Sequence, residues 1–309
     1  MDTGGADLLY ALRNNFHLGA YQAAVGEAQD LQHDDLGGAE TVERDIFLYR
    51  AYIELGQPQV ALSEITNDSP VALQACKLLA TIRSDPTQKE QIVAQVTEWL
   101  SDPAYCTNLL LCELCGEIYM ATEMYEEALK CCSSAGSLEL LALAIQVALQ
   151  IERPDVANKM LSVMLEKDDD APLTQLANAW VNIATGGERV QEAGYIFQEL
   201  GDRFNWTPKL LNGSAICNMV MGKFDQAEKQ ILEALSKDPR NPEYVQDGGA
   251  AWCLSSAFSF GFCYFAFFCS PMNSSNVSRF LFPPFLRLLF STLANVITNS
   301  LHLNKPTAK

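Results

Sequence analysis

Two cysteines in the pattern Cys112-x-x-Cys115, with Cys131-Cys132 nearby, come closest to a catalytic or metal-binding motif in this 309-residue chain. A structural zinc site requires four ligands, and a redox-active pair requires a thioredoxin-like strand and helix around it. At helical spacing, Cys112, Cys115 and Cys132 occupy core positions, where a free cysteine packs as a small hydrophobic residue. We therefore interpret these thiols as core residues, with metal or redox chemistry as the alternative.

The sequence offers few residues for histidine-dependent chemistry, because its only histidines are His17, His33 and His302. The sequence contains no HExxH, Walker lysine loop or GxSxG motif. His17 could face a groove at the end of the first expected helix, but a solvated side chain is the favoured interpretation. The acidic run 168–170 lacks the 12-residue calcium-loop pattern and is interpreted as a solvated loop. We expect a protein that is not an enzyme and that holds no cofactor or metal.

The charge distribution argues against nucleic acid as a partner and divides the chain into two unlike parts. The net charge is −17, and a protein this acidic repels a phosphate backbone. All 38 acidic residues lie in residues 1–247, whereas residues 248–309 hold four basic residues, no acid and ten of the 15 phenylalanines. Residues 1–30 show no uninterrupted apolar run, so we expect no signal peptide, a cytosolic location and reduced cysteines.

Residues 1–247 have the apolar spacing of helices. Apolar residues recur three and four positions apart, as in Leu8, Leu9, Leu12 and Phe16. Glycines and prolines fall mostly between such stretches, which are about 10 to 16 residues long. This length is typical of antiparallel helices joined by tight loops. The sequence therefore predicts an all-α region.

A small residue also returns at intervals of 37, 33, 34, 29, 36 and 34 residues, close to the 34-residue tetratricopeptide (TPR) repeat. The recurring residues are Ala24, Ala61, Ala94, Ala128, Ala157, Ala193 and Ala227, and the match is weakest around Ala94. Each alanine should let the two helices of a hairpin approach closely, and the loop glycine before it should support the sharp turn. We predict an α-solenoid of TPR-like helical hairpins over residues 1–243; an irregular helical bundle is the alternative.

Three phrases within these repeats resemble the coatomer epsilon subunit family: LLYALRNNFHLG at 8–19, ELCGEIYMATEMYEEAL at 113–129, and EAGYIFQEL at 192–200 with the following Trp206-Thr-Pro208. The resemblance runs in order across about residues 5–240. It implies a cytosolic TPR solenoid without catalytic activity. It further implies that the solenoid holds the C-terminal region of the coatomer alpha subunit within the coat of Golgi-to-ER transport vesicles, with peripheral membrane association through that coat.

The concave groove is the surface where a TPR array binds partners, and the residues expected to line it mix acids, arginines and apolar side chains. This mixture favours an extended or hairpin partner with its own charges and hydrophobic anchors over a simple carboxylate clamp. Simple exposure to water is the alternative for each of them. The candidate partner-binding residues are Arg13, Phe16, Glu43, Ile46, Arg50, Glu54, Glu113, Glu117, Met120, Asn212, Ile216 and Met219.

The tail, residues 244–309, follows no repeat pattern, whereas the family continues with a further helical hairpin. Ala250 to Cys269 is long and apolar enough to span a bilayer. One interpretation is therefore a membrane anchor, which would make the protein a tail-anchored TPR adaptor for a chaperone or client. The crowding of Phe, Ser, Cys, Leu and Asn instead favours translated non-coding sequence. We expect the tail to be a separate, non-homologous segment that is a poor cap for a solenoid.

Overall fold

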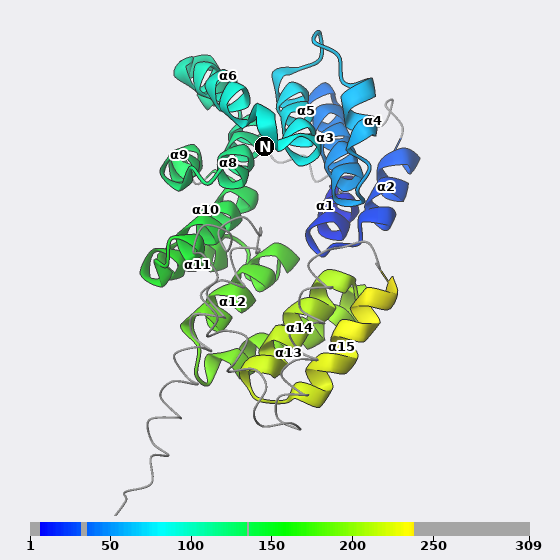
Figure 1. Ribbon diagram of the computed structural model, residues 1–309, viewed down its shortest axis with the longest axis vertical. Helices are drawn as coiled ribbons and strands as arrows, with labels where there is room; N and C mark the ends of the chain where they lie inside the picture. The colour runs from blue at the N-terminus through cyan, green and yellow to red at the C-terminus, as the bar shows by residue number, and fades with distance from the viewer. Residues whose placement is uncertain (1–6, 32–35, 135, 238–309) are drawn as a thin grey trace, which may run out of the picture. The chain divides into compact units, whose positions relative to one another are not determined.

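The computed structural model describes residues 7–31, 36–134 and 136–237, and in these residues it contains helices and no β-strand (Figure 1). The helices of this part are α1 Tyr10–His17, α2 Tyr21–Asp30, α3 Gly38–Glu54, α4 Pro58–Glu64, α5 Val71–Ser84, α6 Lys89–Ser101, α7 Pro103–Cys106, α8 Leu109–Ala121, α9 Tyr125–Cys131, α10 Leu138–Gln150, α11 Pro154–Lys167, α12 Pro172–Thr185, α13 Arg189–Phe204, α14 Pro208–Val220 and α15 Phe224–Lys237. Two short 3-10 helices, η2 Pro86–Gln88 and η3 Cys132–Ser134, complete it. The predicted all-α fold of TPR-like hairpins is confirmed.

Local sequence explains where several helices begin. Proline occupies the first position of α4, α7, α11, α12 and α14, where its missing N–H is not needed by the helix. The helices α8, α10 and α14 begin after Asn108, Ser137 and Thr207, whose side chains accept hydrogen bonds from backbone N–H groups of the first turn. These capping side chains help to fix where the three helices begin.

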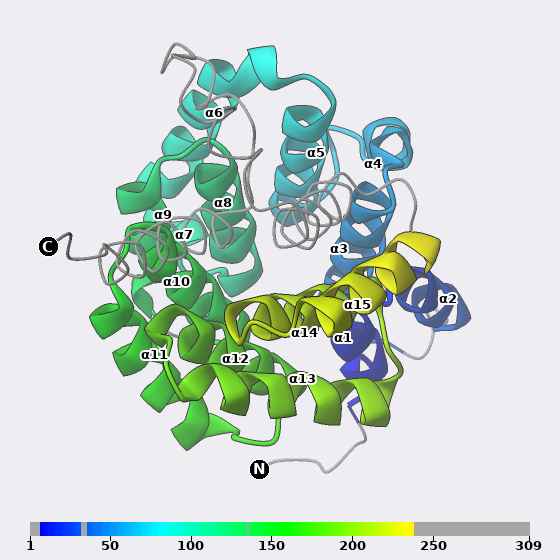
Figure 2. The same cartoon turned by 60° about the horizontal axis from the view of Figure 1, so that its bottom comes forward.

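The described residues divide into two compact units. The first contains the described residues up to Ile151 together with 155–177, and the second contains 152–154 and 178–237. In the first unit, α1 packs on α2, α3 on α4 and α8 on α9. The first helices of these hairpins also pack on one another in the order α1, α3, α5, α8, α10, which can be followed by label in Figures 1 and 2. In the second unit, α14 packs between α13 and α15.

The tight turns inside four hairpins share one hydrogen-bond pattern. Gly19, Gly56, Glu123 and Gly222 have φ values of 83°, 73°, 65° and 74°, in the left-handed region. The N–H of each donates to the carbonyl three residues back, and the next N–H donates to the carbonyl five residues before itself. These two bonds define a Schellman turn, which uses one left-handed residue to reverse the chain. The predicted role of the loop glycine is confirmed at three of these turns, and a glutamate takes it at the fourth.

The recurring alanines are buried as predicted, with one exception. Ala24, Ala61, Ala128, Ala157, Ala193 and Ala227 are each 0% exposed. Ala94, in contrast, is exposed, so its predicted packing role is wrong. The hairpin of α5 and α6 turns through extended Asp85 and the 3-10 helix η2 rather than through a Schellman turn. In the resulting register, Ile92 and Val96 of α6 face the core, and Ala94 lies on the opposite face.

Replacing Glu123 by glycine is expected to stabilise the protein by about 1 kcal/mol, because a left-handed conformation is unfavourable for a residue with a Cβ atom. The Glu123 side chain is exposed, so little packing is lost. The matched opposite change is Gly56→Ala, since a Cβ at Gly56 meets nothing within 4 Å and only the backbone conformation is penalised. Urea unfolding of both variants measures the effect, and a destabilised Glu123→Gly protein would contradict this account of the turn.

The predicted boundary at residue 243 and the tail 244–309 lie outside the described residues. Within residues 7–237, apart from the short gaps in their description, no helix is long and apolar enough to cross a membrane.

Candidate partner-binding face

Helices α1 and α3 bring two of the predicted groove residues into direct contact. Arg13 on α1 donates from Nε to Glu43 Oε1 on α3 at 2.5 Å, and from Nη1 to Asp7 Oδ2 at 2.7 Å. Burial alone would lower the pKa of Arg13, but the hydrogen bond and the charges of Glu43, Asp7 and Glu139 raise it. Arg13 therefore remains a cation that ties the first helix to the second hairpin.

Arg50 on α3 is the centre of a buried group that reaches two other helices. Its guanidinium donates from Nη1 to Glu113 Oε1 at 2.7 Å and from Nη2 to Glu117 Oε1, both on α8. The same guanidinium lies over the rings of Phe16 and Phe47, 4.6 Å and 5.4 Å from their centroids. We call these five residues the Arg50 cluster. Four of them were predicted as groove residues from repeat position alone.

His17 and Glu139 extend this contact region from α1 to α10. His17 is 9% exposed, so the solvated side chain that the sequence favoured is wrong. Its ring packs edge-on against Phe16 and Phe47 at centroid distances of 5.7 Å and 5.8 Å, and its Nε2 lies 3.8 Å from Glu139 Oε1. Aromatic packing and an acidic neighbour thus explain why this histidine is buried.

The carboxyl groups of Glu113 and Glu139 have opposite electrostatic surroundings. For Glu139, burial would raise the pKa, but interaction with His17 and hydrogen bonds from its own backbone and Ser137 lower the pKa to about 2. For Glu113, burial raises the pKa to about 7, with the charges of Glu117 and Glu139 adding to the rise and Arg50 opposing it. The surroundings of Glu139 therefore favour its ionised form, whereas those of Glu113 disfavour ionisation.

Three other predicted residues of the first unit do not join the Arg50 cluster. Ile46 is 1% exposed and belongs to the hydrophobic core. Glu54 is exposed, and its Oε1 lies 3.6 Å from Nη2 of Arg83, which is also exposed. Met120 is half-buried and packs against the same core as Ile46. Of these three residues, only Glu54 is exposed.

The predicted residues of the second unit all lie on α14. Asn212, Ile216 and Met219 are spaced by four and three residues, which places them on one helix face, and all are buried. Beside them, Gln230 of α15 accepts from Asn218 Nδ2 at 2.7 Å and donates to Ser214 Oγ at 2.8 Å. These two hydrogen bonds link α14 to α15. The groove role of all twelve residues stays a prediction.

Sequence reasoning missed Phe47 and Asp7, which contact the predicted Arg50 and Arg13, and it missed Glu139, which lies beside His17. Phe47 lies beside the predicted Ile46 and could have been found by its aromatic type. Glu139 stands in the first turn of α10, a position where an acid is ordinarily explained by the helix dipole alone. Nothing in the sequence pairs it with His17.

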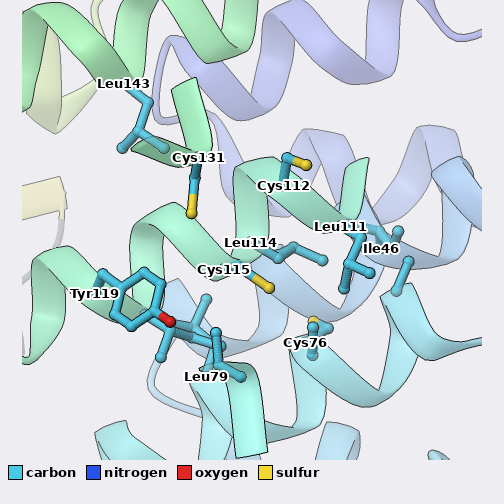
Figure 3. Packing of buried hydrophobic residues seen from close by; sticks show 14 of the residues in the cluster. Ile46, Cys76, Leu79, Leu111, Cys112, Leu114, Cys115, Tyr119, Cys131 and Leu143 are labelled. Atoms are coloured by element: carbon cyan, nitrogen blue, oxygen red, sulfur yellow. The ribbon is translucent and has the colours of Figure 1, made fainter. Parts of the chain in front are cut away.

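The cysteine-rich segment is packed into the core of the first unit, as predicted (Figure 3). Cys112, Cys115 and Cys132 are 4%, 0% and 5% exposed. Burial is the main cause that raises the pKa of each of these thiols, to about 12 for Cys132, so the reactive thiolate is disfavoured. No group of three potential ligands for a metal ion occurs among the residues that the structure describes.

Comparison with known proteins identifies the family of this chain. A family model for the coatomer epsilon subunit matches residues 5–247. Coatomer subunit epsilon-1 of Arabidopsis thaliana is 45% identical over 241 residues, covering 77% of this chain and 81% of that protein. Coatomer subunit epsilon-1 of Oryza sativa subsp. japonica is 45% identical over 237 residues, and coatomer subunit epsilon of Dictyostelium discoideum is 33% identical over 243 residues, each alignment covering 77% of this chain and 81% of the relative. A crystal structure of a tetratricopeptide repeat protein from Parabacteroides merdae ATCC 43184 aligns with a TM-score of 0.46 and 16% identity, covering 84% of this chain and 94% of that one. The match over residues 5–247 shows that this chain belongs to the coatomer epsilon subunit family.

Proposed function

We propose that this chain is a non-enzymatic scaffold subunit of the coatomer (COPI) vesicle coat, acting in Golgi-to-ER and intra-Golgi transport. The family match over residues 5–247 carries this proposal. A coat subunit works by holding other subunits, and an array of TPR-like hairpins supplies an extended surface for that purpose. The location that follows is cytoplasmic, peripheral on Golgi membranes and coated vesicles.

The partner that we propose is the C-terminal region of the coatomer alpha subunit, bound along the groove formed by the first helices of the hairpins. Two features support this. The first helices α1, α3, α8 and α10 carry linked charges and aromatic rings, which suit a partner with charges of its own. The half-exposed carboxylates on this face also leave acceptor sites, since the side chains of Glu117 and Glu43 are 27% and 20% exposed.

Charge reversal at Glu54 tests the groove. Glu54 is exposed on α3, one helical turn from Arg50, so Glu54→Arg changes the charge of the proposed face without breaking the core. We expect the dissociation constant for a C-terminal fragment of the alpha subunit to rise about tenfold. The matched control is Glu126→Arg, the same change on the exposed side of α9. Isothermal titration calorimetry of the two variants gives the comparison.

Co-purification separates this function from the tail-anchored adaptor. Recovery of the alpha-subunit fragment with the full chain supports the coat subunit. Carbonate-resistant membrane association without recovery of that fragment supports the adaptor and contradicts the proposal. If Glu54→Arg and Glu126→Arg weaken binding of the alpha-subunit fragment equally, and the fragment still binds, the coat function stands. The interface then lies elsewhere on the protein.

A further inference from the structure

The Arg50 cluster contains more acid than base. One guanidinium bonds Oε1 of both Glu113 and Glu117, and Arg50 and Glu113 are each 5% exposed. Glu117 differs, because its side chain keeps 27% of its surface exposed. When both carboxyl groups are ionised, a buried site therefore holds one positive and two negative charges. The charge of the deeper carboxylate, Glu113, is the harder one to accommodate.

The groups that face Glu113 do little to relieve this charge. Arg50 approaches from α3, while Glu117 on α8 and Glu139 on α10 are acids that disfavour its ionisation. Cys132 of η3 lies close enough to feel the charge of Glu113 and is a neutral thiol. The histidine of the region, His17 of α1, is engaged by Glu139.

The remaining helices packed on α8 contribute neutral thiols and a hydroxyl, and α9 also carries the acid Glu127, whose charge acts on Tyr119 of α8. Cys76 of α5 faces Arg50 and Glu117, Cys106 of α7 faces Cys112, and Cys131 of α9 faces Cys115. Thr97 of α6 is hydrogen-bonded to the hydroxyl of Tyr119. Arg50 is the cation that opposes the rise in the pKa of Glu113.

We propose that Glu113 is a proton-operated latch between α8 and α3. Protonated Glu113 leaves Arg50 and Glu117 as a neutral ion pair, so that α3, α8 and α10 pack tightly. Ionised Glu113 places a second negative charge between these helices and loosens the face that they form. This behaviour needs no partner, so it stands or falls independently of the coat function.

The direction of the pH effect follows from the pKa of Glu113, which rises from an ordinary value of 4.5 to about 7 on folding. A carboxyl group whose pKa is raised on folding supports the folded state fully below its unfolded value. That support is lost as the pH rises through the folded value. The free energy of unfolding should therefore fall between about pH 5 and pH 8, with most of the loss complete just above pH 7.

Thermal melts of the wild type and Glu113→Gln over about pH 5 to 8 test the latch. Glutamine keeps an oxygen acceptor for Arg50 but has no charge to develop. The wild-type midpoint should fall by about 2–4 °C between about pH 6 and 8 relative to the variant. Glu126→Gln, on the exposed side of α9, is the matched control and should follow the wild type. Glu117→Gln should flatten the wild-type dependence, because Arg50 then serves Glu113 alone.

A second measurement does not depend on any variant folding. In wild-type protein with carboxyl-13C glutamate, one resonance should titrate with a midpoint above about pH 6, well beyond an ordinary glutamate. Parallel melting curves for the wild type and Glu113→Gln would overturn the proposal. So would a spectrum in which every glutamate resonance titrates below about pH 6.

Discussion

Replacing Arg50 by methionine is expected to lower the free energy of unfolding by about 3–5 kcal/mol at neutral pH. Methionine has a similar length but no charge, so Glu113 remains buried without its cation. The two contacts with Phe16 and Phe47 are lost as well. Because an unpaired buried carboxylate is costly, the pKa of Glu113 should rise further, and the destabilisation should be smallest at acidic pH. Urea unfolding at about pH 5.5 and 7.5 measures both effects.

Two comparisons show whether the loss comes from the buried charge. Arg83→Met removes an exposed arginine, 3.6 Å from Glu54, and should cost less than about 0.5 kcal/mol. The double variant Arg50→Met with Glu113→Leu removes both buried charges, so it should recover a large part of the loss. An Arg50→Met protein as stable as Arg83→Met would mean that the Arg50 cluster contributes nothing to holding α3 against α8.

The helical repeat was predictable because its determinants are local. Turn glycines, helix-starting prolines and an alanine about every 34 residues all act within one hairpin, and six of the seven alanines are fully buried. The failure at Ala94 has a local cause too. Asp85 accepts hydrogen bonds from the backbone N–H and hydroxyl of Thr87 and forms a different turn, which changes the register of α6. A constant interval cannot reveal such a change.

The groove residues show where sequence reasoning stops. Repeat position correctly placed Arg13, Glu43, Arg50, Glu113 and Glu117 on first helices whose side chains meet. The sequence could not show that these side chains bond to one another. Such pairings join residues far apart in the chain, and the geometry of their helices decides them. These five residues therefore already serve the protein's own packing, and for this reason a change of charge at Glu113 affects how its helices hold together.

The alanines of the repeat give the second large effect. Replacing Ala128 by leucine is expected to destabilise the protein by about 3 kcal/mol, because the crossing of α8 and α9 has no room for three more carbon atoms. Ala128 is 0% exposed, and its carbonyl oxygen lies 3.8 Å from where a Cβ on Gly116 would stand. That same Cβ would stand 2.6 Å from Leu143 of α10. Helix α8 is therefore packed closely against α10 as well, and it cannot move away from α9 without disturbing α10.

Ala94→Leu is the matched control, because it makes the same alanine-to-leucine change at another of the seven recurring alanines. Alanine and leucine are both strong helix formers, so the two substitutions differ mainly in packing. Ala94 is exposed on α6, and its replacement should change the free energy of unfolding by less than about 0.5 kcal/mol. Urea unfolding of the two variants compares them directly. Equal losses would mean that α6 packs through the face carrying Ala94 after all. Equal tolerance would mean that the crossing of α8 and α9 can open to admit leucine, and the close approach attributed to the repeat alanine would then be wrong.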